Sequence, residues 1–91
     1  MSETSPPSIR LVFLARLRDV LGSAGEDLTL PSHVLTVGEL RGWLAGRGDH
    51  WARELAPGRA VRVAINHSLV DAGATVSNGD EVAFFPPVTG G

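Results

Sequence analysis

The chain of 91 residues contains no cysteine and no lysine. Without cysteine it can form neither a disulfide nor a thiolate metal site, and it has no thiol nucleophile. The absence of lysine rules out copies of this chain linked to one another through lysine side chains, but it leaves attachment to other proteins open.

Positive charge is scarce and dispersed. The formal net charge is −2, and the eight basic residues are all arginines spread along the sequence. Nucleic-acid-binding surfaces need a concentrated basic patch, and an acidic protein is not attracted to anionic membrane surfaces. No apolar stretch approaches the roughly 18 residues needed to cross a bilayer. We therefore expect no nucleic-acid partner and no membrane partner, and a cytoplasmic location.

Metal-binding and catalytic patterns are missing as well. His33, His50 and His67 are irregularly spaced, which does not resemble a set of metal ligands. Asp80 and Glu81 are adjacent, and adjacent strand residues point to opposite faces, so these carboxylates do not converge on one substrate. The glycines lack a phosphate-binding pattern with its lysine. We expect no metal, no bound cofactor and no catalysis by the chain alone.

Length and composition predict one folded domain. A chain of this size buries about 60–65% of its unfolded surface, so it can fold without disulfides or a structural metal. Residues 1–8 contain serine and proline with no apolar run, which predicts a flexible N-terminal extension rather than a signal peptide. We expect the domain over residues 9–87 and a flexible Gly-Gly tail over residues 88–91.

The first part of the domain predicts two strands joined by a short helical segment. Apolar residues line both faces of residues 9–14, which is typical of a strand. Residues 15–21 have helical spacing and stop at Gly22, giving a short helix or turn. Residues 28–30 predict a brief second strand.

The clearest predicted helix follows. Thr36 and Glu39 form a capping box, in which each side chain accepts a hydrogen bond from the other residue's backbone N–H. A further short turn is expected over residues 50–55, with Asp49 as its cap. The apolar stripe that should pack the main helix on the sheet, with Trp43 in the core, consists of Val37, Leu40, Trp43 and Leu44.

The second half returns to strands. Residues 61–65 alternate between apolar and other side chains, a turn follows at Asn66, and Leu69 with Val70 forms at most a two-residue strand. Residues 81–85 form the last strand after a turn. The order ββαβ(β)β with one principal helix predicts an α+β fold, with a mixed sheet covered on one face.

The opposite face of this sheet is also apolar. If Leu11, Phe13, Val63, Val82 and Phe84 lie under the helix, then Val12, Leu14, Ala64, Ala83 and Phe85 point away from it. An uncovered apolar face is typical of a protein interface. The short helical segments could instead cover it, and the residues alone leave both alternatives open.

The chain ends in an unusual tail. Pro86 and Pro87 fix φ near −65° and favour an extended chain, so the tail should project from the last strand. Residues 88–91 span about 13 Å when extended. Gly90 and Gly91 carry no side chain and fit a slot too narrow for a Cβ atom. The terminal carboxylate is ionised at neutral pH and has to be activated before it reacts at its carbonyl carbon.

The segment Phe84-Phe85-Pro86-Pro87-Val88-Thr89-Gly90-Gly91 resembles the end of the small, sulfur-carrier subunits of molybdopterin synthase, a ubiquitin-like β-grasp family. Residues 9–21, 36–44 and 63–70 follow the order and spacing of that family, so the resemblance covers nearly the whole chain from Ile9. It implies a β-grasp fold, with a mixed sheet packed on one principal helix.

The resemblance implies a sulfur carrier for molybdenum cofactor biosynthesis that is not an enzyme by itself. A ubiquitin-activating-type adenylating enzyme would use ATP to convert the Gly91 carboxylate to an acyl-adenylate. A sulfur donor of the desulfurase or rhodanese type would then replace AMP and leave a C-terminal thiocarboxylate. Inside the large subunit of molybdopterin synthase, this group would give its sulfur to cyclic pyranopterin monophosphate.

The resemblance also assigns individual residues. Gly91 is the carried group, and Gly90 gives the tail its slimness. Thr89 is the one visible variation before the glycines and is small enough to be tolerated. The residues implied in partner binding are Leu14, Leu69 and Phe85 on the sheet, and Pro86, Pro87, Val88 and Thr89 in the tail.

Two alternatives remain. A related carrier would deliver sulfur to thiazole or another acceptor, although the Phe-Phe-Pro-Pro sequence favours the molybdopterin branch. A protein-interaction module or ubiquitin-like modifier would instead attach its tail to a lysine of another protein. The partner that co-purifies, and whether that partner with the pterin precursor consumes the sulfur, distinguish these functions.

Overall fold

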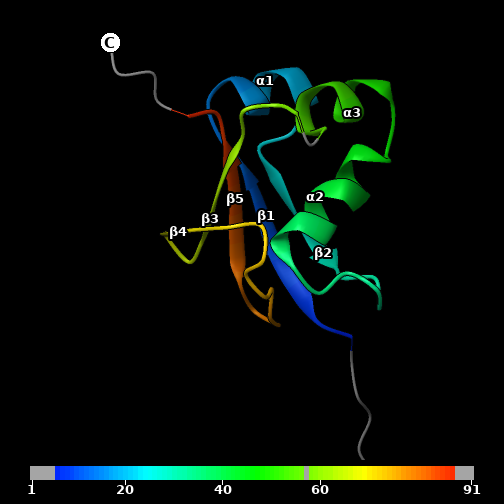
Figure 1. The fold of residues 1–91 in the computed structure, drawn as a ribbon, viewed down its shortest axis with the longest axis vertical. Coiled ribbons are helices and arrows are strands. Elements are labelled where there is room, and N and C mark those ends of the chain that lie inside the picture. Colours follow the sequence, from blue (N-terminus) through cyan, green and yellow to red (C-terminus); the bar gives the residue numbers. More distant parts are fainter. Residues whose placement is uncertain (1–5, 57, 88–91) are drawn as a thin grey trace, which may run out of the picture.

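The computed structural model describes residues 6–56 and 58–87 (Figure 1). The predicted tail, with Val88, Thr89, Gly90 and Gly91, lies outside the described residues. The elements in chain order are β1 (Ser8–Phe13), α1 (Arg16–Leu21), β2 (Gly25–Thr29), α2 (Val37–Ala45), α3 (Asp49–Leu55), β3 (Arg62–Ile65), β4 (Ser68–Val70) and β5 (Glu81–Phe85).

The strands form one mixed sheet in the order β2-β1-β5-β3-β4. The last strand lies at its centre, parallel to β1 and antiparallel to β3, while the outer pairs are antiparallel. The long helix α2 lies beside one face of the sheet (Figure 1). This arrangement confirms the predicted α+β, β-grasp fold, and it places the strand that leads into the tail between β1 and β3.

One face of the sheet carries the core. Alternate residues of the central strands are fully buried, as predicted for Leu11, Phe13, Val82 and Phe84. All three helices contribute to the same core, because each buries leucines in it. The short helices therefore do not cover the opposite face, which decides between the alternatives left open by the sequence. The helical core residues are Leu17, Leu21, Val37, Leu40, Leu44 and Leu55.

Local signals set the helix ends as predicted. Thr36 Oγ1 accepts a hydrogen bond from Glu39 N at 3.2 Å, and Glu39 Oε1 accepts one from Thr36 N at 3.0 Å. The backbone N–H groups of Leu35 and Thr36 hold the pKa of Glu39 below its ordinary value. Helix α1 ends at Gly22, whose φ of 70° lies in the left-handed region.

Several boundaries differ from the prediction. The first strand spans Ser8–Phe13 rather than residues 9–14, and the third begins at Arg62 rather than at residue 61. The second strand begins at Gly25 rather than at residue 28, because it pairs with β1 along its whole length, from Gly25 opposite Val12 to Thr29 opposite Ser8. Strand β4 has three residues rather than two. Asp49 is the first residue of α3 and not its cap, since Gly48 occupies the cap position without a side-chain hydrogen bond.

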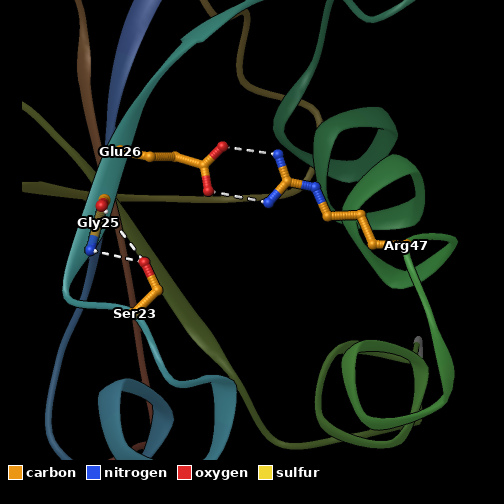
Figure 2. Close-up of polar contacts among 4 residues, drawn as sticks. All are labelled: Ser23, Gly25, Glu26 and Arg47. Atoms are coloured by element: carbon orange, nitrogen blue, oxygen red, sulfur yellow. Dashed lines mark hydrogen bonds and ion pairs between the residues drawn. The ribbon is translucent and has the colours of Figure 1, made fainter.

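An ion pair ties β2 to the connection between α2 and α3 (Figure 2). Arg47 donates to both carboxylate oxygens of Glu26, at 2.9 and 2.7 Å. Its guanidinium carbon lies 5.0 Å from the ring centre of Trp43 and 4.9 Å from that of Trp51. Trp43 was predicted in the core, but it is half-buried at the rim, packed between the core and Arg47.

We expect Gly25→Ala to destabilise the protein by about 2 kcal/mol or more, because strained backbone conformations cost about 1–3 kcal/mol each and a clash adds to this. Gly25 has a φ of 150°, and an added Cβ atom would lie 2.2 Å from the carbonyl oxygen of Leu11. Gly42→Ala is the matched control. Gly42 lies in α2 with nothing within 4 Å of an added Cβ, so alanine should stabilise the helix by about 0.5–1 kcal/mol. Urea unfolding of both variants tests this, and equal stabilities would contradict it.

Candidate functional site

The open face of the sheet carries a continuous row of apolar residues. Val12 lies opposite Ala83, Ala83 opposite Ala64, and Ala64 opposite Leu69, so one row crosses four strands. Neighbouring strands are about 4.8 Å apart, which makes the row about 14 Å long. The two alanines are nearly buried even though none of the helices covers them. Their small side chains leave a shallow apolar floor between Val12 and Leu69.

A second row follows where the sheet ends. Phe13 lies beside Phe84 in the parallel pair, so Leu14 comes level with Phe85 as both strands finish. The backbone N–H of Leu14 donates to the Phe84 carbonyl at 3.1 Å and extends the pairing. Leu14 is 45% exposed and Leu69 is 66% exposed, while Phe85 is half-buried. These three apolar side chains and the two alanines form an exposed apolar patch. Patches of this kind usually mark a protein interface.

The chain leaves the sheet next to α1 and α3. Beyond Phe85, Pro86 and Pro87 are half-buried and belong to no strand or helix (Figure 1). Neither proline has a backbone N–H, so the ladder between β3 and β5 cannot continue through them. A cleft of about 260 Å³ opens beside Pro86 at this point, lined mainly by Arg16, Leu17, Glu54, Arg59 and Val61.

An ion pair between an exposed arginine and a buried glutamate forms one wall of this cleft. Arg16 Nη1 donates to Glu54 Oε1 at 2.6 Å, and Nη2 donates to Oε2 at 3.2 Å. Glu54 is 6% exposed, whereas the Arg16 side chain is 57% exposed. The hydrogen bonds from Arg16 lower the pKa of Glu54, against the opposing effect of burial. The pair joins α1 to α3 next to the first residue of the tail region.

Glu54→Gln should reduce stability at neutral pH and flatten the dependence of stability on pH. Because the folded pKa of Glu54 lies below its ordinary value of 4.5, its stabilising contribution is complete above that value and is lost as the pH falls through the folded pKa. Chemical denaturation between pH 7 and pH 3 measures both effects. Asp27→Asn is the control and should cost little, because its ion pair with Arg10 is exposed on both sides. If the pH dependence of stability were the same in Glu54→Gln as in the unmodified protein, the Glu54 carboxylate would not contribute to stability as described.

A second arginine fixes the loop that lines the cleft. Arg41 of α2 donates to the carbonyl oxygens of Leu55 at 2.8 Å and of Ala56 and Arg59 at 2.7 Å. The last carbonyls of a helix have no partner within it, so Arg41 satisfies the end of α3. Burial lowers the pKa of the Arg41 guanidinium. The positions of Leu55, Ala56 and Arg59, and hence of the cleft beside Pro86, depend on this side chain.

The structure brings together only some of the residues assigned from the sequence. Leu14, Phe85 and Pro86 meet at one end of the sheet, and Leu69 lies across the alanine floor at its edge. Their role in docking stays a prediction. The sequence gives no local signal for Arg16, Arg41 and Glu54, because their partners lie 14 to 38 residues away.

A larger cleft, of about 330 Å³, lies between the start of α2 and the β3–β4 hairpin. It borders the open face at Leu69, and its Arg41 is already bound to three carbonyls. Among residues 6–56 and 58–87, no three histidine or acidic side chains lie close enough to hold a metal ion. Within the same residues, no helix has the length and apolar character of a membrane span.

Comparison with known proteins gives a consistent set of relatives. The ThiS family matches residues 11–91. The molybdopterin synthase sulfur carrier subunit of Haemophilus influenzae is 41% identical over 83 residues, which cover 91% of this chain and 99% of the relative. The subunit of the same name from Escherichia coli is 39% identical with the same coverage.

Solved structures agree on the fold. The small archaeal modifier protein 1 of H. volcanii superimposes with a TM-score of 0.70 and 27% identity, covering 90% of this chain and 99% of that one. The ubiquitin of Caldiarchaeum subterraneum gives a TM-score of 0.57 at 19% identity, covering 93% and 98% of the two chains. The second likeness supports the ubiquitin-like fold alone.

Proposed function

The chain belongs to the ThiS family, and on that premise we propose that it is the sulfur carrier subunit of a molybdopterin synthase. The observation that carries the proposal is the near-complete match to sulfur carrier subunits of that enzyme, together with a family match that runs through Gly91. The Gly90-Gly91 end therefore lies within the residues that the family model matches.

The chemistry follows from what a carboxylate can do. An oxygen of the Gly91 carboxylate attacks the α-phosphate of ATP on an adenylating enzyme, and pyrophosphate leaves. The acyl-adenylate is an electrophile at its carbonyl carbon, where the outer sulfur of the persulfide on a desulfurase- or rhodanese-type donor attacks and displaces AMP. A thiol then cleaves the sulfur–sulfur bond of the resulting acyl disulfide, which leaves a thiocarboxylate on Gly91 and a disulfide on the donor side. The chain supplies the carried group and the means to deliver it, and the enzymes supply the nucleotide and the sulfur.

The fold gives most support to the step in which the tail is presented to a partner protein. The last strand lies at the centre of the sheet, where pairing on both sides holds it, and Pro86 and Pro87 end that pairing next to Leu14 and Phe85. A partner bound to the open face therefore lies next to the start of the tail. We propose the large subunit of molybdopterin synthase as this partner, with Leu14, Leu69 and Phe85 as docking contacts and Pro86 to Thr89 within its channel.

The adenylating enzyme receives the same tail in an earlier step. We propose that both partners use the open face in turn, because the tail can enter only one of them at a time. ATP is then bound by the activating enzyme and not by this chain. The reaction sequence is placed in the cytoplasm as part of this proposal.

Intact-mass spectrometry tests the loading step. The protein is incubated with ATP, its adenylating enzyme and a sulfur source, and the C-terminal peptide is then isolated. Replacement of one oxygen by sulfur on Gly91 is the expected result, and omission of ATP is the control that should prevent it. An unchanged mass in the presence of a demonstrably active adenylating enzyme would refute the carrier function.

The likeness to small archaeal modifier protein 1 favours one other candidate, a protein modifier. In that case the activated Gly91 carbonyl would be attacked by a lysine amine of another protein instead of by sulfur. The two functions leave different products. A modifier gives an isopeptide bond between Gly91 and a lysine of the target, and because the last arginine of the chain is Arg62, trypsin leaves residues 63–91 as a branch on that lysine. A sulfur carrier instead gives a thiocarboxylate that is regenerated as a carboxylate.

A further inference from the structure

Arginines gather around the point where the tail leaves the domain. Arg16 and Arg59 line the cleft beside Pro86, and Arg53 comes immediately before Glu54 in α3. All three arginines lower the pKa of Glu54, Arg16 through its hydrogen bonds and Arg59 and Arg53 through their charges. Glu54 therefore lies inside a group of three positive charges and neutralises one of them.

A fourth arginine flanks the other side of the tail. Arg62 is the β3 residue directly opposite Phe85, and it is exposed. Within the part of the chain that the structure describes, no carboxylate pairs with Arg53, Arg59 or Arg62. Three of these four arginines therefore have no acidic partner among the described residues, on a chain whose net charge is −2. We call Arg16, Arg53, Arg59 and Arg62 the tail-root arginines.

Docking changes the surroundings of these side chains. A protein that encloses the tail brings the mouth of its channel against Pro86, and the tail-root arginines then lie between two protein surfaces. Charges removed from water without a partner oppose association, whereas complementary charges speed the encounter and fix its orientation. The surface around the channel therefore has to supply negative charge to match them.

We propose that the tail-root arginines form an electrostatic docking rim that pairs with carboxylate side chains around the channel mouth of the large subunit. The cleft between Arg16 and Arg59 has room for one such side chain, at about 260 Å³. This inference rests on the proposed function. The rim adds a charged contact surface to the apolar open face. This charged surface determines how fast the tail finds its channel.

The position of the rim argues against a small phosphate as its ligand. The reacting group on Gly91 is five residues beyond Pro86, which is about 17 Å along an extended chain. A nucleotide or pterin phosphate that takes part in the reaction is therefore out of reach of Arg59 while the tail is extended. A carboxylate on the receiving protein has no such restriction.

Binding kinetics of the full-length carrier with the large subunit test the rim. Arg59→Glu should slow association about tenfold or more at low salt, and the difference should shrink at high salt. Arg59→Lys should restore most of the rate. Arg10→Glu is the matched control, because it makes the same change in net charge at the far end of β1, where Arg10 pairs with exposed Asp27. It should alter the rate by no more than about twofold.

The outcomes separate the two proposals. If Arg59→Glu and Arg10→Glu slow association equally, net charge alone matters and the rim is refuted. If Arg59→Glu has no effect while the unmodified carrier binds, the rim is again refuted and the proposed function stands. Failure of the unmodified carrier to bind at any salt concentration would remove the proposed function itself, and the rim with it. Thermal unfolding of each variant checks that the fold is retained.

Discussion

Removal of Gly91 abolishes sulfur loading completely in this account, and addition of one residue after Gly91 does the same. Either change moves the only carboxylate that can be activated away from the position that the adenylating enzyme reads, so no acyl-adenylate forms there. The domain itself should keep its stability, because its core is built from residues of the sheet and the three helices. Intact-mass spectrometry after incubation with ATP, adenylating enzyme and sulfur source measures the loss.

The matched control adds the same residue before Met1. It changes the length and mass of the protein equally but leaves the C-terminus free, so loading should proceed as in the unmodified chain. An extended C-terminus that still accepts sulfur would place the carried group elsewhere. It would contradict the mechanism and leave the fold assignment intact.

Phe84→Ala and Phe85→Ala should have opposite consequences, although the residues are neighbours. Phe84 is fully buried and packs on Phe13 at 5.9 Å between ring centres, so its truncation should cost about 3–5 kcal/mol of unfolding free energy. Phe85 points to the open face and is half-buried. Its truncation should cost less than about 1.5 kcal/mol of stability, but it should weaken binding to the large subunit by about 2 kcal/mol, or roughly thirtyfold.

Urea denaturation and titration calorimetry with the large subunit measure the two quantities separately. Each variant serves as the control for the other, since both remove the same phenyl group from the same strand. Unchanged partner affinity in Phe85→Ala would show that the open face is not the docking surface. A stable Phe84→Ala variant would contradict the alternation of β5 between the core and the open face.

Much of the fold could be predicted because its signals are local. The capping box at Thr36 and the stop at Gly22 act within one helical turn, and both are present in the structure. Alternation along β5 places Val82 and Phe84 in the core through strand geometry alone. The start of β2 could not be predicted in the same way, because Gly25, Glu26 and Asp27 show no apolar alternation and join the sheet only by pairing with β1.

In the candidate site, too, only the features with local signals could be predicted. The apolar residues of the open face were predicted from strand alternation, since Leu14 and Phe85 each fall on the face away from the core. The contacts that shape the root of the tail join distant parts of the chain. Arg16 and Glu54 are 38 residues apart, and Arg41 reaches carbonyls 14 to 18 residues further on. Arginine in a helix has many solvent-exposed roles, so only the tertiary structure identifies these partners.

A single-turnover sulfur transfer shows whether the chain delivers its sulfur to the pterin precursor. The thiocarboxylated chain is mixed with the large subunit and cyclic pyranopterin monophosphate, without ATP or a sulfur donor, and its mass is followed over time. We expect Gly91 to return to a carboxylate as the dithiolene of molybdopterin forms, with two thiocarboxylates consumed for each dithiolene because each supplies one sulfur. If the thiocarboxylate persists while large subunit and precursor are bound, or if its sulfur passes only to another acceptor such as a thiazole precursor, the account is wrong.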